Sequence, residues 1–588
     1  MVKDYLMPDA LENALVMAVA VLLTWTMVVS TDWQSEALVL ISLAAVTVAF
    51  STRKPARVLL QKGQRECHFR AGASDGLAIG CCSPILLLSV ISVMRVIART
   101  PVGPLRTYFW AAHGCAIQPV LFLILGGTPV SADARTHILG ILFGTLPGFI
   151  FEGRLSGAIV LATAAVHAGA LDWSLVRVKA CFTLGEASTL AQGTAILLVD
   201  AVLMTVCEKT HWMEANAALC GDRRTADMLA AEALLAGGVF LTALIACTLA
   251  FLSRIGAISE TSPPHVRSTV LVSVAALLLS AVLLPWLSSL VRMDAFDWLL
   301  GVLTESGRPM LIAYWGASIP LACVLAVRLA PERLAGRDAA NGSASHCAAS
   351  CEPAISPTTS DSSRRARLLL ARKVYHWCAV AMFAPGVLLQ PDLLRVALAG
   401  VLPVFLVLEL VRVADMPPLA KPLSAFLTAF LDARDQGTLI LTHIYLLLGC
   451  AVPIWLDACL PRKVVESEPA AALRAAAPHA GVLVLGVGDA MASVVGVRFG
   501  RTRWPSSRKT YEGSVAGVCS MLCVLALLLG FGSADGPSVR APSPMAWLLL
   551  ASCTVLACAL EAVTSQIDNL FLPLFYQATL LIAAALIS

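Results

Sequence analysis

Apolar runs long enough to cross a membrane recur along almost the whole chain. A membrane-spanning helix needs about 20 mostly apolar residues, because the hydrocarbon layer offers the backbone no water to bond with. Only 14% of the residues are charged, whereas a soluble protein carries roughly 25%. We therefore predict an all-α, polytopic integral membrane protein, surrounded by membrane lipids, with about 14–17 transmembrane or re-entrant helices.

The predicted runs differ in length, and three of them are short enough to be re-entrant or interfacial: 37–50, 137–151 and 155–171. Before residue 330 the runs are 14–29, 37–50, 76–98, 107–130, 137–151, 155–171, 180–206, 229–252, 269–291 and 309–329. After residue 370 they are 374–390, 393–412, 437–456, 476–499, 515–532, 544–562 and 570–588.

The cysteines number 18 and lie scattered through apolar segments, without the spacing of a metal site or a disulfide. We expect them to act as small buried hydrophobic residues. Examples are Cys81, Cys82, Cys181, Cys519 and Cys558.

A stretch from Pro331 to Arg367, rich in Ala, Ser, Pro, Asp and Arg, interrupts the apolar pattern. Such a composition cannot bury enough apolar surface to fold, so we expect disorder. The chain therefore divides into an amino-terminal multi-span membrane region 1–330, a cytosolic linker 331–371 and a carboxy-terminal membrane region 372–588. The formal net charge of +4 is too small to indicate a particular partner, and no nucleic-acid partner is expected.

The stretch Gly486–Gly513 combines a carboxylate inside an apolar run with a dense group of cations. Asp489, Gly496 and Gly500 stand at offsets of 0, 7 and 11, so on a helix they share one face. Small-residue stripes serve helix packing, and basic residues after a span serve as membrane anchors. An Asp inside a span is costly, however, and points to function. Beside cations such as Lys509, it favours a site for a polyphosphate and a divalent metal.

The same stretch resembles the CTP-binding signature of the dolichol kinase family, which other polyprenol kinases share more loosely and phosphatidate cytidylyltransferases more distantly. The chain departs from the pattern at Arg508, where the family usually has a first lysine before Lys509. Arg keeps the charge but replaces a point charge by a planar fork. The residues expected to bind CTP are Gly488, Asp489, Ser493, Gly496, Gly500, Arg503, Trp504, Pro505, Ser507, Arg508, Lys509, Thr510, Glu512 and Gly513.

Two further polar clusters lie at the ends of predicted spans. Arg372 and His376 are four residues apart and share a helical face, and they resemble the family's RK-x2-H motif. Glu561 and Asp568 also share a face, and neighbouring buried carboxylates repel each other unless a cation lies between them. A metal is the natural partner of that pair, although a span end followed by a polar turn gives the same pattern.

The first 330 residues contain a polar group inside a predicted span: Glu186, Gln192 and Asp200. Hydrogen bonding between helices and a role at the active site both explain it. The positive-inside rule places the basic ends of the linker in the cytosol. Counting spans from there places the polar clusters of the carboxy-terminal region on the same cytosolic side.

The resemblance implies a multi-pass enzyme of the endoplasmic reticulum membrane that uses CTP to phosphorylate dolichol and releases CDP. The product would serve as the lipid carrier for protein glycosylation, and the active site would face the cytosol. Asp489 and Asp568 would hold Mg²⁺ or another divalent cation, and Glu512 would orient Lys509 or contact the nucleotide. No protein partner is indicated. The expected catalytic residues are Asp489, Lys509, Asp568, Glu561, Arg372 and His376.

Three alternative functions fit the same features of the sequence. A cytidylyltransferase acting on a lipid phosphate would use the same nucleotide and metal but would release pyrophosphate. A kinase of another isoprenoid alcohol, such as phytol or farnesol, would share the whole mechanism. A membrane transporter also has many spans with acidic residues, but the chain shows no repeat between its halves, and its charges gather at one surface.

Overall fold

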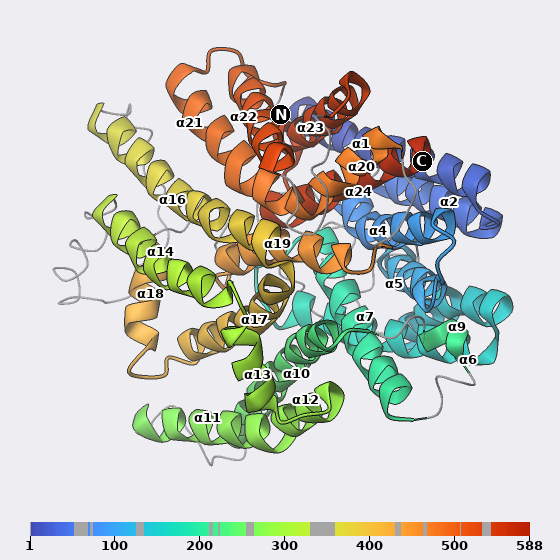
Figure 1. Cartoon of the computed structure of the whole chain (residues 1–588), viewed down its shortest axis with the longest axis vertical. Helices are drawn as coiled ribbons and strands as arrows, with labels where there is room; N and C mark the ends of the chain where they lie inside the picture. Colours follow the sequence, from blue (N-terminus) through green and yellow to red (C-terminus); the bar gives the residue numbers. More distant parts are fainter. Residues whose placement is uncertain are drawn as a thin grey trace.

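The computed structural model describes residues 2–51, 69–70, 75–124, 134–210, 216–220, 224–254, 264–329, 359–429, 437–461, 467–505, 507–531 and 542–588. Within these residues the chain forms helices and no strand, and an isolated antiparallel bridge joins Arg503 to Thr510. The predicted all-α class is confirmed (Figure 1).

The amino-terminal part of the chain, up to Leu329, contains α-helices and a five-residue π-helix, η1, which lies between α11 and α12. Their bounds are α1 (Val2–Ser30), α2 (Gln34–Ser51), α4 (Leu77–Ile97), α5 (Leu105–Ile124), α6 (Ala134–Val176), α7 (Leu184–Lys209), α9 (Ala217–Cys220), α10 (Ala226–Arg254), α11 (Pro264–Leu278), η1 (Leu279–Leu283), α12 (Leu284–Val291), α13 (Ala295–Thr304) and α14 (Arg308–Leu329).

The carboxy-terminal part contains a short 3₁₀-helix, η2, and a second π-helix, η3, within one continuous helical stretch. The bounds are α16 (Thr359–Leu389), α17 (Pro391–Val413), α18 (Ala420–Ala429), α19 (Thr442–Asp457), α20 (Glu468–Ala476), η2 (Ala477–His479), η3 (Val482–Gly488), α21 (Asp489–Phe499), α22 (Tyr511–Phe531), α23 (Pro544–Val563) and α24 (Asp568–Ile587).

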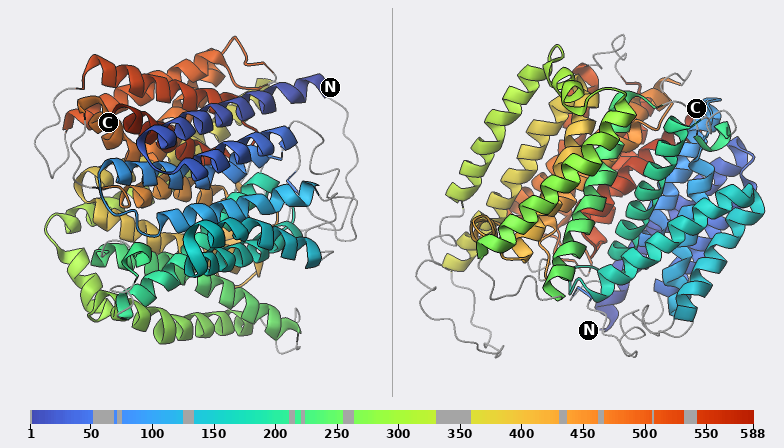
Figure 2. Two further views of the ribbon diagram at one scale, coloured as in Figure 1. Left: turned by 90° about the vertical axis from the view of Figure 1, so that its right-hand side faces the viewer. Right: turned by 90° about the horizontal axis from the view of Figure 1, so that it is seen from below.

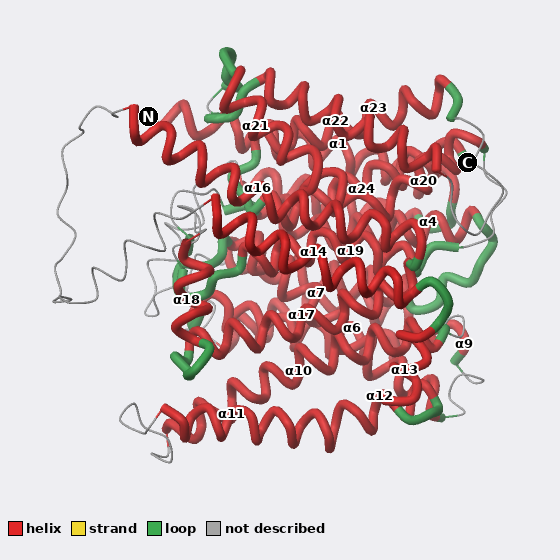
Figure 3. Tube along the Cα trace, turned by 60° about the vertical axis from the view of Figure 1, so that its left-hand side comes forward, coloured by secondary structure: helices red, strands yellow, loops and turns green. Residues whose placement is uncertain are grey.

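The helices have the length and composition of membrane spans. Among the described residues, 12 helices are long and apolar enough to cross a membrane, and shorter apolar helices accompany them. The helices lie side by side, with their connections gathered at two ends and the chain termini at opposite ends (Figure 2, Figure 3). The prediction of a polytopic membrane protein is confirmed.

The structure changes the bounds of several predicted runs. The runs 137–151 and 155–171 form the two arms of α6, which bends at Gly153, where φ is 87° and glycine meets no Cβ penalty. The run 437–456 begins its helix only at Thr442: residues 437–439 form a bend, in which Thr438 donates its backbone N–H to Lys179 O at 3.1 Å. Helix α13 was not predicted.

The linker prediction is only partly covered by the described residues. Residues 330–358 lie outside them, whereas α16 already begins at Thr359, so residues 359–371 are helical rather than disordered. The helix begins in the sequence TSDS, and Ser, Thr and Asp favour helix starts. The division into two membrane regions stays a prediction, and helices of the two regions contact each other directly, α1 and α4 with α24.

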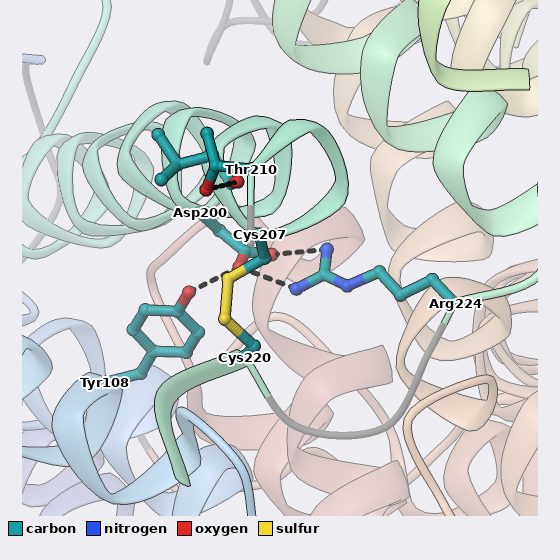
Figure 4. Close-up of a disulfide and its surroundings, with 7 residues drawn as sticks. Tyr108, Asp200, Cys207, Thr210, Cys220 and Arg224 are labelled. Atoms are coloured by element: carbon teal, nitrogen blue, oxygen red, sulfur yellow. Dashed lines mark hydrogen bonds and ion pairs between the residues drawn. A yellow bond between two sulfur atoms is a disulfide. The ribbon is translucent and has the colours of Figure 1, made fainter. Parts of the chain in front are cut away.

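The expectation that the cysteines form no disulfide is wrong for Cys207 and Cys220, whose sulfur atoms are bonded at 2.07 Å. The bond links the last turn of α7 to α9 (Figure 4). The 13-residue separation carries no metal or motif signature, so spacing alone did not reveal it. Cys81, Cys82, Cys181 and Cys558 are buried as predicted, while Cys519 is exposed.

The core element of the carboxy-terminal part is the continuous helical stretch 468–499, formed by α20, η2, η3 and α21. It contacts α16, α19, α22 and α24. Glycine allows close approach along this stretch: a Cβ on Gly486 would lie 2.3 Å from Val380 Cγ2 on α16. The end of this stretch carries the predicted site residues.

Candidate active site

Asp489 stands at the junction of the π-helix η3 and α21. Its backbone N–H donates to Val484 O, five residues earlier, which is the π-helical pattern. Single π-helical turns occur often at functional sites, because they re-aim the side chains that follow. The residue is buried, with 7% of its surface exposed. A carboxylate in such a place needs a cation or hydrogen-bond donors.

Helix α16 supplies those partners from one face. Lys373 Nζ lies 2.5 Å from Asp489 Oδ2, and His376 Nδ1 lies 3.3 Å from the same oxygen. His376 Nδ1 also donates to Leu485 O at 2.7 Å, since a carbonyl oxygen only accepts. Ser493 Oγ, one turn along α21, donates to Asp489 Oδ1 at 3.3 Å. Both carboxylate oxygens therefore have partners.

Lys509 makes a second set of charged contacts with the residues around the α23–α24 connection. Its Nζ donates to Glu561 O at 2.7 Å and to Glu561 Oε1 at 3.1 Å. Asp568 Oδ2 lies 3.8 Å from the same nitrogen. Glu561 belongs to the last turn of α23, and Asp568 is the first residue of α24. A lysine therefore lies beside both carboxylates, and the metal predicted for this pair stays a prediction.

The two sets of contacts form one electrostatic unit. Helix α22, which begins just after Lys509, contacts both η3 before Asp489 and α23, which carries Glu561. We call the six residues Lys373, His376, Asp489, Lys509, Glu561 and Asp568 the lysine–carboxylate cluster. Three carboxylates and two lysines within one partly buried site supply anionic ligands for a metal and cations for phosphate oxygens.

The residues between α21 and α22 fold into a hairpin-like loop. Trp504 N donates to Lys509 O at 3.0 Å, and Tyr511 N donates to Thr502 O at 2.9 Å. The Trp504 ring stacks on Tyr511 with the centroids 4.2 Å apart. Ser507 Oγ accepts from Lys509 N at 3.2 Å. The loop therefore holds the backbone of Lys509 in place, directly before α22.

Glu512 supports this loop rather than Lys509. Its carboxylate accepts the backbone N–H of Thr502, with distances of 3.0 and 3.2 Å to its two oxygens. Lys509 instead takes its carboxylate partners from Glu561 and Asp568. The predicted alternative that Glu512 orients Lys509 through a direct contact does not match this geometry.

The stripe of small residues on α21 packs against the start of α22. Thr510 Oγ1 accepts from Gly513 N at 3.2 Å, which is the contact of an N-cap residue with the third residue of its helix. A Cβ on Gly496 would lie 3.0 Å from Thr510 Oγ1, and a Cβ on Gly500 would lie 2.6 Å from Thr510 Cγ2. In this structure the two glycines contact Thr510 at the start of α22, and the predicted approach of the nucleotide to this face stays a prediction.

The remaining predicted residues are not members of the lysine–carboxylate cluster, and they differ in burial. Arg503, Pro505 and Arg508 are exposed on the loop. Gly488 packs against α22, where its Cβ would lie 2.7 Å from Met521 Sδ. Arg372 belongs to α16, but its side chain is outside the described residues.

Lys373 is the member of the cluster that sequence reasoning missed. Its signal is the three-residue spacing to His376, which places the two side chains on one helical face. In the sequence it reads only as one more basic residue at the end of the linker. In the folded protein α16 packs beside η3, and Lys373 therefore forms an ion pair with Asp489.

Glu186, Gln192 and Asp200 lie at three different levels along α7 and have separate partners. Glu186, at the start of α7, lies beside the connection between Glu561 and Asp568, where Ile567 N donates to its Oε1 at 2.9 Å. Gln192 Nε2 donates to Ser188 Oγ of its own helix at 3.0 Å. Asp200 pairs with Arg224 at 2.8 Å near the disulfide (Figure 4).

The fold and the cluster together define an integral membrane protein with a charged site suited to phosphate chemistry where several helices end. The model of the dolichol kinase family matches residues 6–537. Human dolichol kinase is 31% identical over 527 residues, which cover 88% of this chain and 87% of the relative. Dolichol kinase EVAN of Arabidopsis thaliana is 42% identical over 222 residues, 38% of this chain and 36% of the relative. The chain belongs to the dolichol kinase family. No solved structure matches it.

Proposed function

We propose that this protein transfers the γ-phosphoryl group of CTP to the hydroxyl group of dolichol and releases CDP. The observation that carries the proposal is the lysine–carboxylate cluster, which lies within and beside the stretch that resembles a CTP-binding signature. The relatives' names support dolichol as the acceptor. Family membership also removes the basis for the transporter alternative.

The residues of the cluster suit phosphoryl transfer, which depends on positioning and charge neutralisation more than on covalent help from the protein. A bond forms between the dolichol oxygen and the γ-phosphorus, and the bond from that phosphorus to the oxygen it shares with the β-phosphorus breaks. Lys509 and Lys373 neutralise phosphate oxygens during this exchange. The exposed Arg503 and Arg508 guide the nucleotide into the site.

The hydroxyl proton of dolichol passes to a carboxylate of the cluster, and we assign this role to Asp568. Its side chain is 23% exposed, whereas that of Asp489 is 11% exposed and is contacted by Lys373 and His376. A more accessible carboxylate is the better placed of the two to reach an incoming hydroxyl group.

A divalent cation such as Mg²⁺ fits the donor chemistry of this site. Among the described residues, no group of three His, Cys, Asp or Glu side chains is arranged to hold a metal. Mg²⁺ commonly takes only one or two carboxylates and completes its shell with water and substrate phosphates. Asp489 would hold it, with Asp568 nearby, and the bound ion would neutralise charge on the phosphates.

The disulfide supports a cytosolic orientation of the site. Helix α7 has 26 residues and is about 39 Å long, enough to cross a bilayer. Thr183, just before its first turn, contacts Gln566 beside the cluster, while Cys207 in its last turns forms the disulfide. Disulfides persist in oxidising compartments such as the lumen of the endoplasmic reticulum. The cluster, at the opposite end of α7, would then face the cytosol.

The isoprenoid chain of dolichol would lie against the lipid-facing surface of α21 and α22. Val497, Phe499 and Val515 are apolar and more than half exposed there. They belong to the same two helices that hold Asp489 and follow Lys509. A hydroxyl group at the end of such a chain reaches the cluster without leaving the membrane boundary.

The test uses purified protein in detergent with Mg²⁺ and CTP labelled at either the α- or the γ-phosphate. With dolichol, the γ-label is expected in the lipid and the α-label in CDP. With phosphatidate, an α-label in the lipid together with pyrophosphate would establish a cytidylyltransferase and refute the proposal. Comparing dolichol with phytol and farnesol as acceptors identifies the preferred alcohol.

A further inference from the structure

The connection between α23 and α24 determines how two carboxylates of the cluster face each other. It consists of residues 564–567, with Glu561 three residues before it and Asp568 directly after it. Thr564 and Gln566 are buried, with 7% and 0% of their surface exposed. Because this connection is so short, a shift of its backbone changes the separation of Glu561 and Asp568 from Lys509.

The partners of this connection come from the amino-terminal part of the chain, more than 380 residues earlier for two of the hydrogen bonds. Ile567 N donates to Glu186 Oε1 at 2.9 Å. Thr183 Oγ1 donates to Gln566 Oε1 at 2.6 Å. Gly76, at a φ of +59°, lies so close that a Cβ there would be 2.3 Å from Gln566 Oε1.

Glu186 is itself fixed from several sides. It forms a capping box at the start of α7: its Oε2 accepts from Thr183 N at 2.9 Å, and its own N–H donates to Thr183 Oγ1 at 3.2 Å. It also forms an ion pair with Arg70, and the side chains are only 0% and 3% exposed. A buried pair of this kind adds little net stability but holds one geometry.

We propose that Glu186 is a positioning residue for the reaction, and that the start of α7 holds the 564–567 connection so that Glu561 and Asp568 face Lys509. This gives the amino-terminal region a direct part in building the site. The activity part of the proposal rests on the proposed function, whereas the structural part does not.

The test compares the Glu186→Ala and Thr183→Val variants with Thr189→Val as the matched control. Thr189 is also buried on α7 but bonds only to backbone oxygens of Gly80 and Gly185. The first readout is hydrogen–deuterium exchange in peptides covering residues 564–570. We expect exchange there to accelerate at least about 10-fold in Glu186→Ala, which loses the bond to Ile567 N.

The second readout is kcat per folded protein, with the CTP and dolichol dependence measured separately. A misplacement of catalytic groups by 1 Å costs roughly 100-fold, so we expect kcat to fall about 10- to 100-fold in Glu186→Ala, with little change in KM for CTP. Thr183→Val should shift both readouts in the same direction by less, and it decides the question alone if Glu186→Ala does not fold. Thr189→Val should change neither readout.

Two results would overturn the proposal: unchanged exchange in both variants, or faster exchange with an unchanged kcat per folded protein. If the wild-type protein phosphorylates no lipid, the proposed function fails instead. The exchange measurement then still decides whether the start of α7 holds the connection.

Discussion

At the residue scale, the site consists mainly of two lysines that form ion pairs with three carboxylates. A buried charge without a partner is expensive, so each carboxylate needs a cation within the protein before any ligand arrives. Lys373 supplies it for Asp489, and Lys509 supplies it for Glu561 and Asp568. Phosphate oxygens would compete with the carboxylates for the two lysines. A metal ion would then replace the lysines as the partner of the carboxylates.

Replacing the two aspartates should have different consequences. Losing even an outer-shell partner of a metal costs 10–100-fold in affinity, so Asp489→Asn should raise the Mg²⁺ concentration for half-maximal turnover at least about 10-fold. Asp568→Asn removes the proposed proton acceptor and should lower kcat about 10²- to 10⁴-fold, with the Mg²⁺ dependence nearly unchanged. Initial rates over a Mg²⁺ titration measure both effects. Identical behaviour of the two variants would contradict the separate roles.

The sequence identifies most members of the cluster, because a carboxylate within or beside a span is costly and therefore stands out. Asp489, Glu561 and Asp568 were found in that way, and His376 by its spacing from Arg372. Lys373 and the role of Glu512 were not, because both depend on which surfaces meet in three dimensions. Lys373 lies beside Asp489 only because the helices pack together. The carboxylate of Glu512 reaches back across the loop and accepts the backbone N–H of Thr502.

At the scale of elements, the glycines of α21 and α22 act as a close contact between helices. A Cβ on Gly513 would lie 2.6 Å from Ala492 O. Gly513→Ala must therefore push the two helices apart, and overpacking of this kind typically costs about 1–3 kcal/mol. We expect a lower thermal unfolding temperature and, because Lys509 immediately precedes α22, a lower turnover.

Gly530→Ala is the matched control for that substitution. Gly530 lies on the same helix, and nothing stands within 4 Å of the Cβ it would gain. The control should keep the wild-type turnover, and its unfolding temperature should stay the same or rise, because Ala favours a helix more than Gly does. An unchanged unfolding temperature in Gly513→Ala, together with weaker CTP binding, would mean that the stripe contacts the nucleotide rather than α22.

Elements with a clear hydrophobic signal could be predicted, and those formed by local exceptions could not. Most spans appear where apolar runs predict them, since length and composition are sufficient. The π-helix before Asp489 leaves no clear signal in the sequence, because it differs from an α-helix only in backbone hydrogen bonds that reach five residues back instead of four. The predicted runs 137–151 and 155–171 form two helical segments of α6 that are separated at Gly153, where the backbone is not helical.

At the scale of the whole molecule, the helices connect two chemically different ends. One end holds the cluster, and the other holds the disulfide and the Asp200–Arg224 pair (Figure 4). The sequence predicted a single cytosolic side for the carboxy-terminal polar clusters from the distribution of basic residues. The disulfide, which the cysteine spacing had not revealed, independently indicates that the other end of the helices faces the lumen. This agrees with a cytosolic position of the cluster.

This orientation can be tested in sealed microsomes. A membrane-impermeant reductant added from the cytosolic side should leave the Cys207–Cys220 bond intact until the membranes are opened. An Arg501→Cys variant, placed on the exposed loop, should react with an impermeant maleimide without opening, compared against the unmodified chain as background. Reduction of the disulfide in sealed vesicles would reverse the proposed orientation.

Lys509 contacts two carboxylates of the lysine–carboxylate cluster, which we propose performs phosphoryl transfer. The most direct measurement is the initial rate of γ-label transfer from CTP to dolichol by Lys509→Met, with Lys421→Met, an exposed lysine on α18, as the matched control. Loss of a preorganised charge at a reacting group costs about 10²–10³ in rate. We predict that loss for Lys509→Met and a wild-type rate for Lys421→Met. A folded Lys509→Met protein within a few-fold of the wild-type rate would contradict the account.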